Sequence, residues 1–151
     1  MRRLMTAITR WLTAGAAAIA CSGCSTGPIT ARRIELAIGP TFANLVQLQV
    51  SWMGLPPMTR ADVDVTARCR KSAAPGAPSE HAGSGEWVCT IEWHGPGRRP
   101  LRDVYDVVVS TDGCYSATVE GDSLARPTLT TDDGRDVKNL LFVFEGCFDT
   151  T

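Results

Sequence analysis

Residues 86–93 read EWVCTIEW, and the pattern of this stretch indicates how the chain folds. One set of alternate positions holds only apolar residues: Trp87, Cys89, Ile91 and Trp93. The other set holds Glu86, Val88, Thr90 and Glu92, which are mostly polar. A period of two is typical of a β-strand with one face buried. The stretch therefore predicts a strand whose tryptophans and cysteine face a core.

Similar alternation appears on both sides of this stretch. Before residues 86–93, the alternating apolar residues are Val63, Val65, Ala67 and Cys69. After residues 86–93, they are Tyr105, Val107, Val109, Tyr115, Ala117 and Val119. Leu140–Phe144 is a final apolar run, while Asp112-Gly113 and Asp133-Gly134 are turn signals. Residues 72–85 are rich in Gly, Ala, Pro and Ser and predict a flexible loop. We therefore expect an antiparallel sheet of four to five strands.

The segment before the strands has helical spacing. Apolar residues recur at steps of three or four: Ile34, Ile38, Phe42, Leu45, Leu48 and Trp52. Gly39-Pro40 interrupts this run, so either the helix kinks there or a second helix begins at Pro40. The alternation over Val46–Trp52 also suits a strand, but the longer helical pattern is favoured. The predicted fold class is α+β, with an N-terminal helix packed on the sheet.

The first 24 residues have the pattern of an export signal. Arg2, Arg3 and Arg10 precede an apolar stretch at 11–20 that is too short to span a bilayer. The sequence Cys21-Ser22-Gly23-Cys24 that follows resembles the lipobox of bacterial lipoproteins, although the family's usual Leu three places before the cysteine is absent. This resemblance implies lipidation at Cys24, or alternatively at Cys21, and anchoring on the outer face of the cytoplasmic membrane. An ordinary secretory signal is the competing interpretation.

The number of cysteines, six, helps to choose between Cys24 and Cys21 as the lipidation site. Lipidation at Cys24 removes Cys21 with the signal and leaves an even set of Cys69, Cys89, Cys114 and Cys147. Three connectivities are open to four cysteines, and the order of the strands favours Cys69–Cys89 with Cys114–Cys147. The spacing of these four lacks a C-x-x-C pair, so disulfides are favoured over zinc and no metal site is expected.

Composition and charge fit one globular domain of 31–151, preceded by a signal at 1–23 and a tether at 24–30. The chain has 151 residues, is 44% hydrophobic and has a net charge of −1. Loss of Arg2, Arg3 and Arg10 with the signal would leave 12 basic and 16 acidic residues. An acidic domain is not expected to bind nucleic acid or to adhere to anionic headgroups, so the lipid would provide the contact with the membrane.

Motifs for catalysis are absent from the sequence. His81 and His94 both lie in predicted turns, and neither belongs to an H-E-x-x-H, G-x-S-x-G or P-loop motif. Asp132–Asp136 has carboxylates without the spacing of a calcium loop, and Arg98, Arg99 and Arg102 are expected to be solvated. No catalytic residue and no cofactor are predicted. Trp87 and Trp93 are expected in the core, but an exposed pair would be ligand-facing.

The domain also resembles small exported domains of high-GC Gram-positive bacteria. The resemblance rests on Trp87-Val88-Cys89, on DGCY at 112–115 and on FEGCFD at 144–149. It implies a location outside the membrane and a helix on a curved antiparallel sheet, as in cystatin-like domains. We therefore expect a non-catalytic binding or scaffold module of the cell envelope, whose partner is an envelope protein, a polymer or a small apolar ligand. The alternative is a small hydrolase, which needs His81 or His94 beside a carboxylate.

Overall fold

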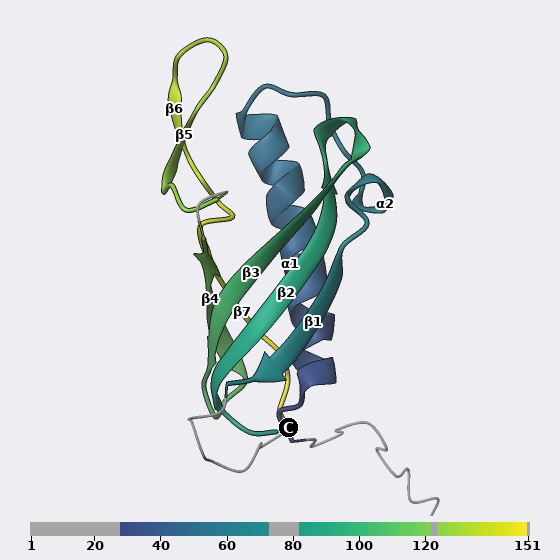
Figure 1. Cartoon of the computed structure of the whole chain (residues 1–151), viewed down its shortest axis with the longest axis vertical. Helices are drawn as coiled ribbons and strands as arrows, with labels where there is room; N and C mark the ends of the chain where they lie inside the picture. The colour runs from purple at the N-terminus through teal and green to yellow at the C-terminus, as the bar shows by residue number, and fades with distance from the viewer. Residues whose placement is uncertain (1–27, 73–81, 122–123, 151) are drawn as a thin grey trace, which may run out of the picture.

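One long helix lies across one face of a five-stranded antiparallel sheet in the computed structural model, which describes residues 28–72, 82–121 and 124–150 (Figure 1). The helices are α1 (Ala31–Trp52) and the short α2 (Arg60–Val63). The sheet has the order β1-β2-β3-β4-β7, formed by Thr66–Lys71, Gly85–Gly95, Arg99–Val109, Cys114–Glu120 and Val143–Cys147. The predicted α+β class, with one helix on an antiparallel sheet, is confirmed.

Helix α1 is continuous through Pro40. It begins at the N-cap Thr30, whose hydroxyl accepts a hydrogen bond from the Arg33 N–H. The alternative of a second helix starting at Pro40 is therefore wrong, and so is the alternative strand over Val46–Trp52. No helix in the described part of the chain is long and apolar enough to cross a membrane.

The buried stripe of α1 departs from the predicted one in its second half. Its members are Ile34, Ile38, Phe42, Ala43, Val46, Gln49 and Val50. Leu48 and Trp52 were expected on this face, but their side chains are 49% and 46% exposed. The reason is that the contact with the sheet follows steps of four, from Ile34 to Val50, rather than the mixture of steps that the apolar residues suggest.

Phe42 is the centre of the aromatic core. Its ring lies 5.4 Å from Trp93, 5.9 Å from Tyr105 and 6.0 Å from Phe144, each in an edge-to-face arrangement. Trp93 and Tyr105 belong to β2 and β3, and Phe144 belongs to β7. One helical side chain therefore contacts strands from both halves of the sheet.

Trp87 and Trp93 are core residues and not a ligand-facing pair. Their side chains are 1% and 6% exposed. The Trp87 indole N–H donates to the Gly83 carbonyl, and that of Trp93 donates to the buried Asp103 carboxylate at 2.8 Å. Because α1 covers this face of β2 (Figure 1), the expected core position of both rings is confirmed, and the alternative of an exposed, ligand-facing pair is not.

Three element boundaries differ from the sequence-based expectation. The first strand begins at Thr66, because Val63 ends α2 and Asp64 adopts a left-handed conformation with φ 46°. The last strand begins at Val143, since the residues before it form a turn. The predicted tether also overlaps the domain, because Ile29 is 7% exposed and the Gly83 N–H donates to its carbonyl.

A two-stranded hairpin, absent from the expectations, projects beyond the end of the sheet near the C-terminal end of α1 (Figure 1). It consists of β5 (Thr128–Thr130) and β6 (Asp136–Lys138), and the predicted Asp133-Gly134 turn joins them. The buried Asn139 holds its base, because the side-chain amide donates to the carbonyls of Leu124 and Arg126. The base of the hairpin is thus closed by the hydrogen bonds of one buried side chain, and Leu124 at this base packs against the core.

Both predicted disulfides are present. Cys69 and Cys89 are directly opposite each other in β1 and β2, and Cys114 and Cys147 are opposite each other in β4 and β7. The first bridge lies on the helix-covered face, where Cys89 is 0% exposed. The second lies on the outer face, since Tyr115 next to Cys114 points into the core. Each bridge fastens an edge strand of the sheet.

Removing each disulfide separately tests these two environments. The bridges close loops with sequence separations of 20 and 33, for which chain entropy predicts losses of about 3 and about 4 kcal/mol in the free energy of unfolding. Because the loss of the buried Cys89 sulfur adds a packing cost of roughly 1 kcal/mol, we expect Cys69→Ala/Cys89→Ala and Cys114→Ala/Cys147→Ala to cost about the same, about 4 kcal/mol. Urea unfolding measures both. A clearly smaller loss for the inner pair would contradict its placement in the core.

Candidate binding groove

A depression lined by three arginines and one glutamate lies between α1 and the edge strand β1. It has a volume of about 430 Å³, which is in the size range of ligand and peptide sites. We call it the α1–β1 groove. It is lined by Arg32, Glu35, Leu36, Gly39, Pro40 and Ala43 of α1, by Arg60 of α2, and by Val65–Arg68 in and just before β1. Residues of α1 and residues between 60 and 68 therefore contribute to one surface.

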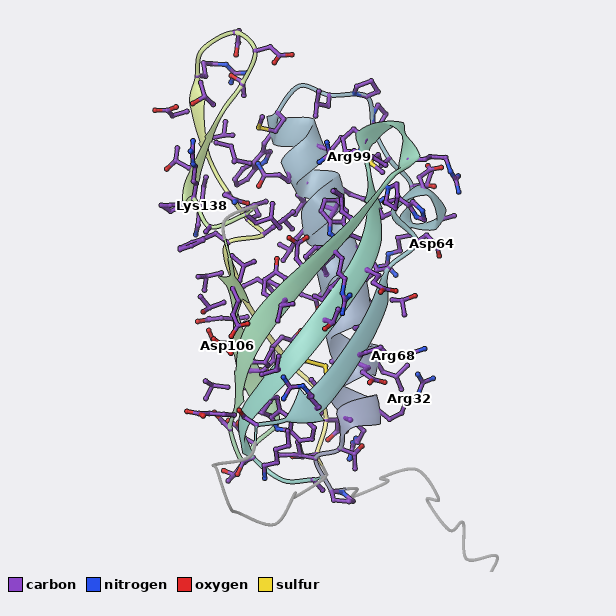
Figure 2. All side chains as sticks on the ribbon, viewed as in Figure 1. Arg32, Asp64, Arg68, Arg99, Asp106 and Lys138 are labelled. Atoms are coloured by element: carbon purple, nitrogen blue, oxygen red, sulfur yellow. A yellow bond between two sulfur atoms is a disulfide. The ribbon has the colours of Figure 1, made fainter. Side chains whose placement is uncertain are left out.

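Three arginines give this groove a positive charge. Arg32 and Arg68 extend outward from α1 and β1 where these two elements meet (Figure 2). Among the described residues, neither forms an ion pair with a carboxylate. Arg60 is oriented by Asn44, whose side-chain oxygen accepts from Nε at 3.1 Å and from Nη2 at 2.7 Å. The guanidinium groups are therefore available to an anion.

Glu35 is the one acidic residue that lines the groove, and it contacts the backbone. Its Oε1 accepts a hydrogen bond of 3.0 Å from the Cys69 N–H of β1. The carboxylate thereby covers part of an exposed strand edge, where unpaired amides would otherwise attract another chain. Since this oxygen is engaged with a backbone amide, the lining remains positive overall.

The Gly39-Pro40 step gives the groove its shape. Pro40 has no N–H, so the Leu36 carbonyl receives no helical hydrogen bond from it. A Cβ added at Gly39 would meet nothing within 4 Å, and the Leu36 side chain is 56% exposed. On the helix side, the groove is therefore shallow at Gly39 and is bordered by the apolar Leu36 side chain. The Leu36 carbonyl there lacks the N–H donor that residue 40 would normally supply. The Gly39-Pro40 step seen in the sequence lies at this side of the groove.

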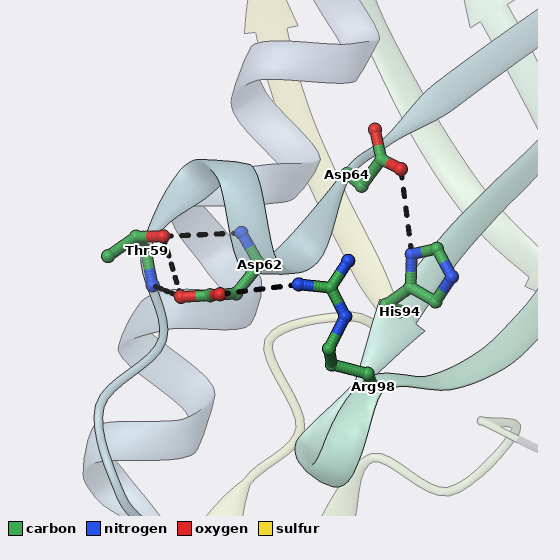
Figure 3. A network of polar contacts seen from close by, with 5 residues as sticks. All are labelled: Thr59, Asp62, Asp64, His94 and Arg98. Atoms are coloured by element: carbon green, nitrogen blue, oxygen red, sulfur yellow. Dashed lines mark hydrogen bonds and ion pairs between the residues drawn. The ribbon is translucent and has the colours of Figure 1, made fainter.

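A second depression, of about 410 Å³, lies beside His94 at the other end of the sheet. His94 Nδ1 is 3.8 Å from Asp64 Oδ2, and the two form an ion pair only when the imidazole is protonated (Figure 3). The Asp64 side chain is 67% exposed. In the described part of the chain no hydroxyl is hydrogen-bonded to His94. The pair therefore lacks the aligned geometry of a nucleophile activated by a base.

The neighbouring polar contacts have a structural role. Thr59 and Asp62 form a capping box at the start of α2, and Asp62 also lies 3.8 Å from Arg98 (Figure 3). The hydrogen bond from the Thr59 hydroxyl is the main cause that lowers the pKa of Asp62, and its backbone N–H adds to this effect. The network fastens α2 to the turn between β2 and β3, which is the 3-10 segment Pro96–Arg98.

Two carboxylates meet on the outer face of the sheet. Asp106 of β3 and Glu120 of β4 share a side-chain hydrogen bond, which raises the pKa of Glu120 above its ordinary value, and their Coulomb repulsion raises it further. Arg70 partly offsets the shift. In the described ranges no three acidic, histidine or cysteine side chains gather as a metal site would require. The pair therefore affects the charge on the outer face of the sheet and does not form a metal site with other described residues.

The residues singled out from the sequence have different positions. Cys21, Cys24 and His81 lie outside the described residues. Asp133 and Arg135, within the acidic turn, form an ion pair at 2.7 Å in the β5–β6 hairpin, in agreement with a charged turn. Sequence reasoning missed the α1–β1 groove, because its arginines lie far apart in the chain and none belongs to a motif.

The Asp106–Glu120 pair predicts a pH-dependent stability. A raised pKa means that the folded state binds the proton more tightly, so stability falls as pH rises through the ordinary value of 4.5. Glu120→Gln should therefore give a small rise in Tm at about pH 7 and no rise at about pH 3, where the carboxyl is protonated in both states. Thermal unfolding at both pH values measures this. Glu145→Gln is the matched control, and an equal rise for both variants at neutral pH would contradict the pairing.

No protein-family model, curated protein or solved structure matches this chain. Its function is therefore inferred from its own residues.

Proposed function

We propose that this chain is a lipid-anchored, non-catalytic binding module of the bacterial cell envelope. In this proposal, the domain holds an acidic segment of an envelope protein in the α1–β1 groove. The lipobox-like sequence around Cys24 motivates the anchor. The two cross-strand disulfides are consistent with a domain that folds in an oxidising compartment.

The charge of the groove carries the proposed binding role. Residues after the signal are acidic overall, with 12 basic and 16 acidic side chains. Against this background Arg32, Arg60 and Arg68 converge on one depression without carboxylate partners among the described residues. Arginine presents several donors in a plane that matches a carboxylate. An acidic segment therefore complements this surface better than a neutral or basic one.

The hydrolase alternative has less support. Its best candidate is the His94–Asp64 pair, in which the 3.8 Å separation is longer than a hydrogen bond. Asp64 is largely exposed and terminates α2 in a left-handed conformation. A base that must take a proton from a nucleophile needs a hydroxyl or thiol within reach. Recognition through the groove requires no such arrangement, and we therefore favour binding.

The anchor is tested by metabolic labelling with a fatty acid in a bacterial host. Wild-type chain and Cys21→Ala should incorporate the label, whereas Cys24→Ala should lose it. Globomycin, which blocks lipoprotein signal processing, should cause a precursor of the wild type to accumulate. Loss of the label from Cys21→Ala alone would move the anchor to Cys21. An unlabelled wild type would overturn lipidation altogether.

The binding role is tested with the full chain in a neutral detergent and a fluorescent oligoglutamate peptide as the probe. Each exposed arginine–carboxylate contact is worth about 0.5 kcal/mol, so Arg32→Gln/Arg68→Gln should weaken binding about fivefold, and added salt should weaken it further. Fluorescence anisotropy measures Kd.

Arg99→Gln is the matched control, since Arg99 is an exposed arginine at the opposite end of the sheet from Arg32 and Arg68 (Figure 2). It should leave the affinity for oligoglutamate unchanged. If the Arg99 variant weakens binding as much as the groove variant does, or if oligolysine binds as well as oligoglutamate, recognition by the groove is excluded.

A further inference from the structure

The outer edge of β1 directs backbone groups toward the groove that Ala67 lines. The Ser72 N–H donates to the Glu86 carbonyl, and the register Cys69↔Cys89 continues along both strands. In an antiparallel ladder every second residue bonds to the neighbour, so Ala67 and Cys69 direct their N–H and C=O groups away from β2. The Cys69 N–H, which reaches Glu35 of α1, confirms this direction. The edge of β1 therefore faces α1 across the groove.

These edge groups are only partly satisfied. Glu35 accepts from the Cys69 N–H, and the Ala67 carbonyl receives a long contact of 3.4 Å from the neighbouring Arg68. Within the described ranges, the Ala67 N–H and the Cys69 carbonyl have no hydrogen-bond partner. An unpaired strand edge is a template for an added strand. The hydrogen-bonding capacity of the groove therefore exceeds what its arginines alone supply.

We propose that an acidic peptide binds the α1–β1 groove as an added β-strand along β1, and that Glu35 guards this edge until the peptide arrives. This inference rests on the proposed function, because it specifies how the same groove holds its partner. Backbone groups of the peptide pair with Ala67 and displace Glu35 from Cys69. Its acidic side chains, which alternate in direction along a strand, reach Arg68 on one side and Arg32 on the other.

The shape of the groove is consistent with an extended segment. The wall opposite β1 is low at Gly39 and Ala43, so a backbone can approach it closely. The Leu36 carbonyl, which lacks the amide of Pro40, offers an acceptor from the helix side. Charge also selects the occupant, since a basic strand would meet three guanidinium groups.

Two peptides of equal charge separate strand addition from charge attraction. One is oligoglutamate, which presents carboxylates on both faces of a strand, and the other is oligoglutamate with alternate backbone amides N-methylated, so that it cannot form a ladder. The full chain in neutral detergent should bind the unmethylated peptide about tenfold more tightly, because ladder hydrogen bonds are lost from the other. Hydrogen exchange at the Ala67 N–H should slow on binding. Equal affinities, or unchanged exchange at Ala67, would overturn strand addition while leaving an arginine-dependent affinity intact.

Variants of Glu35 test whether its hydrogen bond with the Cys69 N–H competes with the peptide for the edge of β1. Glu35→Ala frees the Cys69 N–H and removes a negative charge, so it should tighten binding of the unmethylated peptide about fivefold. Glu35→Gln keeps an acceptor oxygen and should show a smaller gain. Glu86→Gln, which removes an exposed charge from β2, is the control. It should leave the affinities for the unmethylated and the N-methylated peptide unchanged. If Glu35→Ala instead dimerises in sedimentation and does not bind peptide, the edge takes a second copy of the chain and the proposal is wrong.

Discussion

The edge-to-face packing of Phe42 against the sheet is the contact on which the rest of the fold depends. Its ring contacts Trp93, Tyr105 and Phe144, which belong to strands far apart in sequence. Tyr105 further connects the core to the turn before β7, because its hydroxyl donates to the Leu141 carbonyl at 2.7 Å. Since the rings hold α1 at one position across the strands, they also set the distance between α1 and β1. The groove is a consequence of this packing.

The elements that could be predicted from sequence are those whose burial is periodic. Trp87, Cys89, Ile91 and Trp93 alternate because β2 lies between β1 and β3 and has one face covered by α1. The errors in the strand boundaries fall where local hydrogen bonds, not burial, decide the structure. Val63 continues the alternation of β1, yet the Thr59–Asp62 capping box draws it into α2. Leu141 is buried in a turn rather than a strand, and the side-chain oxygen of Asn139 accepts its N–H.

The candidate site was less predictable than the fold. Arg32, Arg60 and Arg68 each look like ordinary solvated arginines in sequence, because nothing near them repeats or forms a motif. Their convergence depends on the crossing of α1 over β1 and on the position of α2, both of which are tertiary. Gly39-Pro40 is the signal that could have drawn attention to this region, since a proline inside a helix removes a hydrogen bond and calls for a structural or functional reason.

The disulfides and the guarded edge address the same physical problem. A five-stranded open sheet has two edge strands, and each is tied to its neighbour by one bridge, through Cys69 in β1 and Cys147 in β7. Covalent fastening prevents an edge strand from peeling away, but it leaves the outward backbone groups unpaired. On β1, the Glu35 side chain covers one such group with a single hydrogen bond. A single side-chain contact can be exchanged for a ladder of backbone bonds, whereas a covering loop would have to unfold, so this edge combines a fixed strand with an accessible surface.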